Sequence, residues 1–546
     1  MHLDHVHTLA PTLRQVIDTA AAHLATTCAE DGRIRTSRVD EHGSVAYDLA
    51  TLASAVTAAE RLADAADRDQ VAAELALVFA ADVAVDVRAR VSGREAAFGL
   101  PNDLLNAQAE AVAAGRDPGL LAGLGERVLA TGQVGARQLP EDLEMVRQTF
   151  ARFADDRVKP VAERVHREDD DVPEEIISGL AELGCFALSI PEEYGGVATG
   201  DDDELINMVV VTEELSRGSL GVAGSLITRP EIIGTAILKG GTEAQRARWL
   251  PAIAAGEKMC AVAVTEPAVG SDVAGVSCTA RPDGDEWVLD GVKTWCTFAG
   301  RAEYLLVLAR TDPDRSLGHR GLSLFVVEKQ PFSGHAWRAE QEAGGVMDAR
   351  AIPTLGYRGM HSFEVSFDGW RVPATALIGE GEGLGRGFYL QMQAFANARL
   401  QTAARAQGVM QAALDEAVRY AGERQVFASR LADYELTKVK VARMAAWLTA
   451  CRTLSTEVAR QLARDDAGGQ LAASQVKQLA CRAAEWVTRE AQQLHGGYGY
   501  AEEYTVSRLF VDARVLSIFE GTDEVLALRV IARQLLADAL AEVSHG

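Results

Sequence analysis

The hydrophobic period changes twice along this chain, and that order limits what it can fold into. Residues 1–140 and 141–258 carry apolar side chains at helical spacings of three and four. From 259 to about 380, short runs rich in β-branched and aromatic residues alternate with turn dipeptides such as Asp290-Gly291. Residues 381–546 return to long helical patterns. The sequence therefore predicts a mainly α protein, with a small β domain between helical domains.

Two patterns make this expectation specific. The β segment should form a small barrel or sandwich, because its strands are short and regularly separated by turns. An apolar stripe with a period near 3.5 runs from Val441 through Met444 and Leu448 to Leu454, which favours the core of a helix bundle over a cofactor site. Strands are predicted at residues 260–264, 287–289, 304–308, 322–327 and 363–367.

Composition excludes several classes of function. At about 150 residues per domain, 546 residues predict three or four domains. The charge of 54 − 78 = −24 disfavours a nucleic-acid partner, because a phosphate backbone would be repelled. No apolar run reaches the ~20 residues of a membrane helix, since Asp82 and Asp86 interrupt the best one, and the first residues do not resemble a signal peptide. Seven scattered cysteines lack metal-site spacing, so we expect no metal and a cytoplasmic location.

Two motifs in the β segment could hold a ligand. Residues 264–272 (VTEPAVGSD) follow a predicted strand, and a Gly/Ser turn there would expose backbone N–H groups to a phosphate or a polar ring edge. The alternative is an ordinary loop. In residues 293–297 (KTWCT), Trp295 offers a flat apolar face and Thr297 a hydroxyl, although Trp295 could equally be a core aromatic.

Three motifs follow in the last helical segment. Residues 424–427 (RQVF) end a predicted helix, and residues 493–500 (QLHGGYGY) form a glycine-rich turn. In residues 517–522 (SIFEGT), an apolar approach precedes Glu520 and a glycine follows it. A carboxylate in such surroundings can act as a general base. The alternative is an ordinary acidic residue near a helix N-terminus.

Taken in order, TEPxxGSD, KxWxT, RxxF, QxxGG and FEGT resemble the acyl-CoA dehydrogenase family over residues ~141–540. The resemblance implies a helical domain at 141–258, a small β-barrel domain at 259–380 and a C-terminal four-helix bundle at 381–546. An N-terminal helical extension at 1–140 precedes these domains and is expected to pack on them or to add to a subunit interface. The resemblance to the family also implies FAD as cofactor and oxidation of an acyl-CoA at Cα–Cβ.

The same resemblance implies a role for each matched residue. Glu520 is the expected base for the α-proton, and its backbone N–H helps to polarise the thioester carbonyl. Ala398 stands where some relatives carry an alternative base. The expected cofactor contacts are Val264, Thr265, Gly270, Ser271, Trp295, Thr297 and Thr522. Arg424, Phe427, Gln493, Gly496 and Gly497 are expected to reach the FAD of a neighbouring subunit, in a homodimer or a dimer of dimers. Ser271, Arg399, Arg229, Phe519 and Gly521 are the expected substrate contacts. Glu435 and Glu524 depart from the glutamine of many relatives, which puts their FAD contacts in doubt.

The extension and residues 225–231, 354–362, 387–392 and 483–490 resemble one branch of this family, and that resemblance implies methylsuccinyl-CoA as substrate and mesaconyl-CoA as product. The terminal carboxylate of this substrate needs a cation or several hydrogen bonds in the pocket, and we expect Arg229 to supply the cation, with Arg217 as second choice. Either arginine could instead form a structural ion pair with Glu231 or Glu214. The open alternatives are a generic short- or branched-chain dehydrogenase of isobutyryl, butyryl or glutaryl type, an acyl-CoA oxidase, and a DNA-binding relative. Electron-transferring flavoprotein is the expected electron acceptor.

Overall fold

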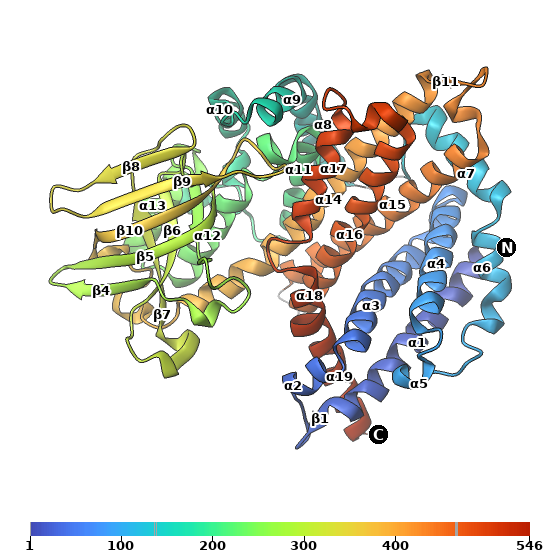
Figure 1. The fold of residues 1–546 in the computed structure, drawn as a ribbon, viewed down its shortest axis with the longest axis horizontal. Coiled ribbons are helices and arrows are strands. Elements are labelled where there is room, and N and C mark those ends of the chain that lie inside the picture. The colour runs from blue at the N-terminus through green and yellow to red at the C-terminus, as the bar shows by residue number, and fades with distance from the viewer. Residues whose placement is uncertain (1, 136, 138, 202, 465–467, 546) are drawn as a thin grey trace. The chain divides into compact units, whose positions relative to one another are not determined.

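The computed structural model describes residues 2–135, 137, 139–201, 203–464 and 468–545, which form two compact units (Figure 1). The helical unit contains Met1–Glu144 and Thr402–Gly546, and the sheet unit contains Met145–Gln401. The N-terminal extension and the C-terminal helices thus share one unit, although the whole sheet unit separates them in sequence.

The helical unit is built from two sets of helices. The extension supplies α1 (His2–Cys28), α2 (Thr36–Glu41), α3 (Gly43–Asp64), α4 (Gln70–Val91), α5 (Glu95–Phe98), α6 (Ala109–Gly115) and α7 (Pro118–Thr131). The C-terminal part supplies α14 (Gly387–Glu423) from Thr402 onward, α15 (Glu435–Ala463), α16 (Gly469–His495), α17 (Thr505–Leu516), α18 (Asp523–Val525) and α19 (Ala532–His545). Two short hairpins complete it, β1 (Ala29–Glu30) with β2 (Arg33–Ile34) and β11 (Gln425–Val426) with β12 (Ser429–Arg430).

The extension packs on the C-terminal helices, as the sequence predicts. Helices α3, α4 and α7 contact α15, α3 also contacts α16, and α1 contacts α19. At the crossing of α7 and α15, a Cβ added to Gly125 would lie 2.0 Å from the Lys438 carbonyl oxygen. Only glycine lets the two backbones approach so closely.

Asp82 joins the two sets of helices. This carboxylate, which interrupts the best apolar run of the sequence, is buried on α4. It pairs with Arg116 at 3.0 Å and with Arg443 of α15 at 2.8 Å, and it accepts a hydrogen bond of 3.1 Å from the Trp447 indole. These contacts offset the free-energy cost of burying the Asp82 carboxylate in the protein interior.

The apolar stripe of α15 forms bundle core, which confirms the prediction. Val441, Met444, Leu448 and Leu454 are all buried. Helix α14 packs on α15 through Gln407, whose amide donates to the Cys451 carbonyl, and on α16 through the Tyr420 ring, which stacks on His495 at 4.1 Å.

The sheet unit places helices beside one large sheet. Its helices are α8 (Glu141–Phe153) from Met145 onward, α9 (Lys159–Glu168), α10 (Glu174–Glu182), α11 (Glu204–Gly218), α12 (Thr228–Gly240), α13 (Glu243–Ala254) and the start of α14. Its strands are β3 (Cys260–Ala263), β4 (Thr279–Asp283), β5 (Glu286–Thr297), β6 (Tyr304–Arg310), β7 (Leu322–Glu328), β8 (Ala336–Glu340), β9 (Val346–Ile352) and β10 (Ser362–Pro373).

The strands form one curled sheet in the order β3-β6-β4-β5-β10-β9-β8, with β7 paired to β6. Strand β6 is buried on both faces: Tyr304, Leu306 and Leu308 pack in a core with α12 and α13, whereas Leu305 and Val307 pack in a second core with β5 and β10. Both neighbours of β6 in the sheet order, β3 and β4, run parallel to it, and the other pairings are antiparallel. All five predicted strands are present.

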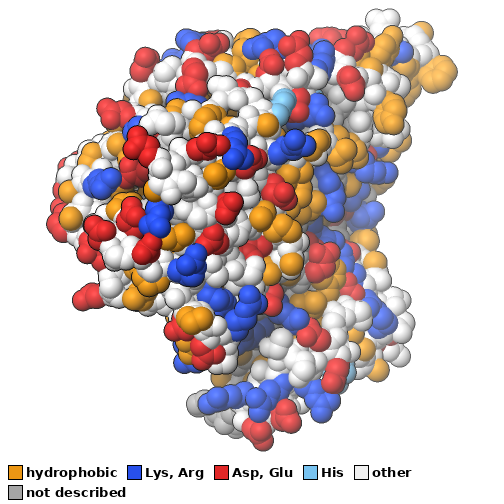
Figure 2. All heavy atoms as spheres, turned by 60° about the vertical axis from the view of Figure 1, so that its left-hand side comes forward, with side chains coloured by type: hydrophobic (Ala, Val, Ile, Leu, Met, Phe, Trp, Pro, Cys, Tyr) orange, Lys and Arg blue, Asp and Glu red, His pale blue; other side chains and the backbone are white. Residues whose placement is uncertain are grey.

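The structure also bears on the cysteines and on the search for a membrane-spanning helix. All seven cysteines are buried and free. Among the helices that the structure describes, none is both long and apolar enough to span a bilayer. Acidic and basic side chains are interspersed over the face that Figure 2 shows.

Candidate active site

Glu520 lies on a strained turn between α17 and α18. Its φ is +58° and that of Gly521 is +97°, so two consecutive residues adopt the left-handed region that favours glycine. The turn closes through the Asp523 N–H, which donates to the Ser517 carbonyl at 3.1 Å, and the Thr522 hydroxyl caps α18 by accepting from the Val525 N–H.

The Glu520 carboxylate is nearly buried, with a side chain 10% exposed. Its Oε1 lies 3.3 Å from Nη2 of Arg405, and its Oε2 has no hydrogen-bond partner among the described residues. An unsatisfied buried carboxylate oxygen can accept a proton from a bound molecule. The alternative interpretation of Glu520, an ordinary acidic residue near a helix N-terminus, does not account for this burial.

Arg405 is a site residue that the sequence analysis missed. It is fully buried on α14, its Nη2 also contacts the Thr402 hydroxyl at 2.5 Å, and its guanidinium lies 4.7 Å from the centre of the Phe519 ring. Arg405 thus contacts both the Phe519 ring and the Glu520 carboxylate. Since 115 positions separate Arg405 from Glu520, no local pattern could have joined them.

In the sheet unit, one buried ion pair ties the two predicted motifs together. Lys293 Nζ donates to Oε1 of Glu266 at 2.9 Å and to the Val264 carbonyl at 3.0 Å, and both charged residues are buried. The other Glu266 contacts come from Ser277 and the Cys278 N–H. Burial alone would raise the pKa of Glu266, but Lys293 and these donors outweigh it and hold the pKa below its ordinary value.

The tip of the loop after β3 and the ring of Trp295 are both exposed to solvent. Gly270 and Ser271 are exposed at the tip of the loop that follows β3. Trp295 is 55% exposed with a φ of +57°, so it is not the core aromatic that the sequence left open. Thr297 lies at the end of β5, where its hydroxyl shares a 2.9 Å hydrogen bond with Ser362. Thr265 and Trp295 are linked through the neighbouring Thr294 N–H, which donates to the Thr265 carbonyl at 2.8 Å.

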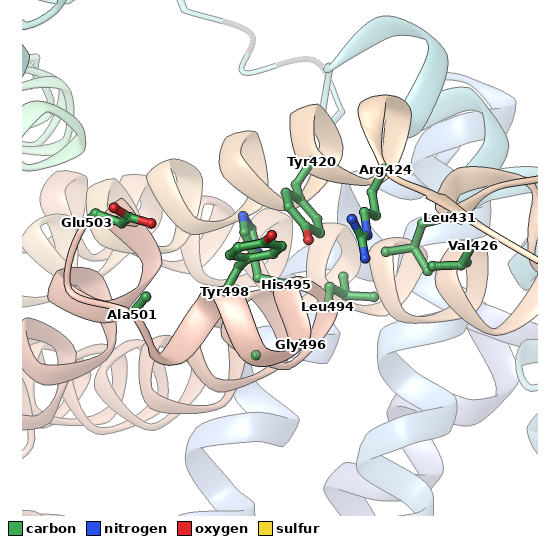
Figure 3. Close-up of a pocket in the computed structure, with 11 residues that line it drawn as sticks. Tyr420, Arg424, Val426, Leu431, Leu494, His495, Gly496, Tyr498, Ala501 and Glu503 are labelled. Carbon is green, nitrogen blue, oxygen red and sulfur yellow. The ribbon is translucent and has the colours of Figure 1, made fainter.

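In the helical unit, a pocket of about 550 Å³ opens where the β11–β12 hairpin meets the glycine-rich turn (Figure 3). Arg424, Gly496 and Gly497 line it, as three of the five residues predicted to reach a second subunit. Phe427 stands at the tip of the hairpin, 95% exposed, with a φ of +48°. Gln493 is exposed on the last turns of α16 but does not line the pocket. The remaining lining residues are Tyr420, Val426, Leu431, Leu494, His495, Tyr498, Ala501 and Glu503.

The pocket wall is chemically suited to an anion with an aromatic part. The Arg424 guanidinium lies over the Tyr498 ring at 5.7 Å, which leaves its charge available to a ligand. A Cβ on Gly496 or Gly497 would meet nothing within 4 Å, so a ligand can approach this backbone closely. Burial lowers the pKa of His495, although its Nδ1–H donates to the Ala491 carbonyl.

The two arginines considered for the substrate carboxylate differ sharply. Arg217 forms ion pairs with Asp155 at 2.8 Å and Glu214 at 2.8 Å, so it is a structural residue. Arg229 is 7% exposed at the start of α12 and forms no ion pair within the described part of the chain. Its one hydrogen bond there runs from Nη1 to the Ser225 carbonyl at 3.2 Å. Arg399, the other predicted substrate contact, is also buried, on α14.

The two glutamates that replace the glutamine of many relatives both lie at the start of a helix. Glu435 is the first residue of α15 and Glu524 lies in the first turn of α18, and both are exposed. A carboxylate there interacts favourably with the helix dipole, which gives both residues a structural reason that needs no ligand.

The fold and these groups indicate a class of enzyme: a nearly buried carboxylate, an exposed tryptophan ring and a glycine-lined pocket suit oxidation of a carbon acid by a bound flavin. Residues 140–257, 261–370 and 385–536 match the N-terminal, middle and C-terminal domains of acyl-CoA dehydrogenases. The chain belongs to the acyl-CoA dehydrogenase family, FAD-dependent oxidoreductases that act on the CH–CH bond of acyl-CoA thioesters.

Known relatives extend this result. The chain is 46% identical to (2S)-methylsuccinyl-CoA dehydrogenase of Cereibacter sphaeroides, over 74% of this chain and 71% of that protein. A glutaryl-CoA dehydrogenase structure with bound glutaryl-CoA matches with a TM-score of 0.65 at 31% identity, covering 72% of this chain and 95% of the other. A Mycobacterium smegmatis glutaryl-CoA dehydrogenase in complex with FADH2 matches with a TM-score of 0.60 at 26% identity, over 74% and 96%.

Proposed function

We propose that this enzyme oxidises (2S)-methylsuccinyl-CoA to mesaconyl-CoA. The observation that carries the proposal is Arg229, a buried guanidinium that the described residues leave without an ion pair. The similarity to (2S)-methylsuccinyl-CoA dehydrogenase supports the same substrate. Butyryl-CoA and isobutyryl-CoA have no terminal carboxylate, and glutaryl-CoA has one without the methyl branch.

The electrostatics of Arg229 favour an anionic acyl chain. A buried charge without a counter-ion costs several kcal/mol, and the single carbonyl acceptor of Ser225 offsets only part of this cost. A substrate carboxylate would complete the pair with charge-assisted hydrogen bonds. Ser225 and Thr228, both buried beside Arg229, add further polar groups for a short dicarboxylate.

Glu520 is the residue we assign to the α-proton. Its unpartnered Oε2 accepts the proton, and its backbone N–H polarises the thioester carbonyl so that the α-carbon becomes acidic enough to react. Phe519 and Arg405 limit the access of water to the carboxylate. Ser271 and Gly521 complete the proposed substrate contacts.

The residues present fit FAD. When bound, this cofactor supplies the acceptor for the β-hydride. Trp295 and Thr297 offer an apolar face and a hydroxyl to a fused ring, Val264, Thr265 and Gly270 supply backbone and loop contacts, and Thr522 is a further contact. Arg424, Phe427, Gln493, Gly496 and Gly497 serve the FAD of a second subunit in a homodimer or a dimer of dimers.

We propose electron-transferring flavoprotein as the acceptor of the electrons. The alternative, an oxidase that reduces oxygen, is tested by bleaching the flavin anaerobically with substrate and then admitting air. Slow reoxidation in air together with fast reoxidation by electron-transferring flavoprotein supports a dehydrogenase. Rapid reoxidation in air would establish the oxidase.

The substrate is tested by assaying the purified holoenzyme with an artificial electron acceptor against methylsuccinyl-, isobutyryl-, butyryl- and glutaryl-CoA. We expect the highest kcat/KM with the (2S) isomer of methylsuccinyl-CoA. A clear preference for any of the other three thioesters would replace the proposal with a generic short- or branched-chain dehydrogenase.

A further inference from the structure

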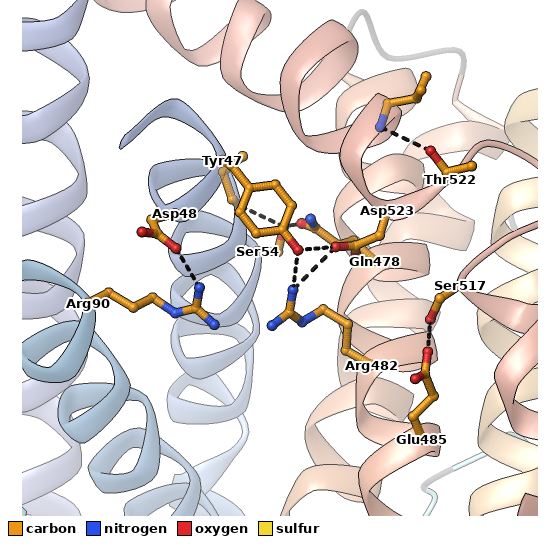
Figure 4. Close-up of polar contacts among 12 residues, drawn as sticks. Tyr47, Asp48, Ser54, Arg90, Gln478, Arg482, Glu485, Ser517, Thr522 and Asp523 are labelled. Atoms are coloured by element: carbon orange, nitrogen blue, oxygen red, sulfur yellow. Dashed lines mark hydrogen bonds and ion pairs between the residues drawn. The ribbon is translucent and has the colours of Figure 1, made fainter. Parts of the chain in front are cut away.

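The turn that carries Glu520 is held from outside by the N-terminal extension. Tyr47, on α3, donates its hydroxyl proton to Oδ2 of Asp523, and Arg482 of α16 donates to the Tyr47 hydroxyl at 2.7 Å (Figure 4). Arg482 also contacts Asp523 directly at 3.2 Å. The side chains of Tyr47, Arg482 and Asp523 thus contact one another, and Asp523 lies three positions after Glu520.

Two further contacts to the turn come from α16, in addition to the Arg405 contact from α14. Lys477, which is buried, donates to the Gly521 carbonyl at 2.7 Å. Glu485 accepts from the Ser517 hydroxyl, as Figure 4 shows. Tyr47 therefore adds a contact from a different segment to a turn that two left-handed residues make strained. A strained conformation persists only where its surroundings over-determine it.

The Tyr47 hydroxyl is suited to a lasting contact. Burial and the hydrogen bond to Asp523 both raise the pKa of Tyr47, so the phenol keeps its proton and remains a donor. Asp523 is nearly buried, and its backbone N–H closes the Glu520 turn on the Ser517 carbonyl. A shift of the Asp523 side chain is thus transmitted through one residue's backbone to the turn itself.

We propose that Tyr47 is a positioning residue for catalysis: through Asp523 it fixes the turn that aims the Glu520 carboxylate at the substrate α-carbon. The extension then contributes to the chemical step although it contains no catalytic residue. The inference rests on the proposed role of Glu520 as base.

The test compares Tyr47→Phe, which removes only the hydroxyl, with Ser54→Ala. Ser54 lies on the same helix and donates to Gln478 of α16 at 3.0 Å, so its variant also removes one hydrogen bond between the extension and α16, but none to the turn. For each holoenzyme we would measure FAD content, Tm, kcat and KM with methylsuccinyl-CoA and butyryl-CoA, and the isotope effect of α-deuteration on anaerobic flavin bleaching.

For Tyr47→Phe we expect kcat about tenfold lower, KM within about twofold of the wild-type value and a larger isotope effect, because misalignment slows proton abstraction itself. Ser54→Ala should leave kcat and the isotope effect unchanged. Asp523→Asn should lower kcat similarly, and the double variant Tyr47→Phe/Asp523→Asn should be no slower than Asp523→Asn, since both act through one contact.

Equal kcat for Tyr47→Phe and Ser54→Ala, or multiplying losses in the double variant, would overturn the proposal. Failure of the proposed function looks different. In that case wild-type flavin is not bleached by either thioester, or Glu520→Gln remains active.

Discussion

Glu520 combines two properties that seldom occur together, a backbone with positive φ and a buried carboxylate oxygen without a hydrogen-bond partner among the described residues. Each costs free energy of folding, on the order of 1–3 kcal/mol. Such costs are typical of groups held ready for a reaction, so this residue is the first to test.

Glu520→Gln should lower kcat by about 10²–10⁴-fold, because the amide cannot accept the α-proton. Bound FAD and Tm should stay close to wild type, since the change is nearly isosteric. Flavin absorbance and steady-state assays check this, with Glu502→Gln, an exposed carboxylate in the same unit, as control. Retained activity in Glu520→Gln would show that another residue is the base.

Arg229→Met should separate the substrates. Loss of a buried partner for the carboxylate costs about 2–5 kcal/mol, so kcat/KM for methylsuccinyl-CoA should fall at least about 30-fold, whereas that for butyryl-CoA should change little. The matched control is Arg217→Met, which removes an arginine already engaged with Asp155 and Glu214 and should affect both substrates alike. Equal losses on both thioesters in Arg229→Met would contradict the assignment.

Among single residues, the sequence predicts those whose role depends on their immediate neighbours in the chain. Glu520, Trp295 and Phe427 are predicted site residues because each stands in a short motif that resembles the family. Arg405 and Tyr47 are not, since one lies 115 and the other 476 positions from its polar partner. Burial of an arginine is decided by which helices pack around it, and no spacing rule encodes that.

Among the elements, β5 connects the two ligand motifs predicted in the sheet unit, because its Lys293 pairs with Glu266 of the loop after β3 and the strand ends at Thr297. The strands themselves follow from their alternation and turns. Their register does not: the pairing of Glu266 with Lys293 depends on how β3, β6, β4 and β5 are ordered in the sheet.

Glu266→Gln should lower the free energy of unfolding by about 3–5 kcal/mol at pH 7, because it leaves the fully buried Lys293 charge without a counter-ion. Asp290→Asn, which disrupts an exposed pair with Arg281, should cost about 1 kcal/mol or less. Chemical denaturation of both variants measures the difference. A cost for Glu266→Gln no greater than that of Asp290→Asn would mean that the pair is not structural.

The same pair has a pH signature. The pKa of Glu266 is lowered on folding, so its stabilisation is complete above the ordinary value of 4.5 and is lost as pH falls through the folded-state pKa. Wild-type stability should therefore fall more steeply on acidification below about 4.5 than that of Glu266→Gln.

For the whole molecule, the proposed role of Arg424 in a second subunit can be tested by complementation. Arg424→Ala and Glu520→Gln should each be nearly inactive alone. In a hybrid dimer, one site would combine an intact Glu520 with an intact Arg424 of the other subunit. Random co-assembly should restore about a quarter of wild-type activity, whereas recovery of none would mean that each site takes Arg424 and Glu520 from the same subunit.

The sequence predicts the four segments, but not which of them pack together. Four segments were predicted, yet the first and last share one helical unit. Helical periodicity predicts that α3 and α7 each bury a face, but it cannot identify α15 and α16 as the helices that cover them, because pairing across more than 250 residues is set by shape and by contacts such as Asp82 with Arg443.

The packing of α1 on α19 has a consequence for biosynthesis. The extension is translated before the sheet unit, but the C-terminal helices that pack on it, α15, α16 and α19, are translated after the whole sheet unit. At about 5–20 residues per second, the extension waits on the order of tens of seconds for these helices. A nascent chain of this kind is a natural client of chaperones, and a ribosome that stalls within the sheet unit would release a product that is prone to aggregate.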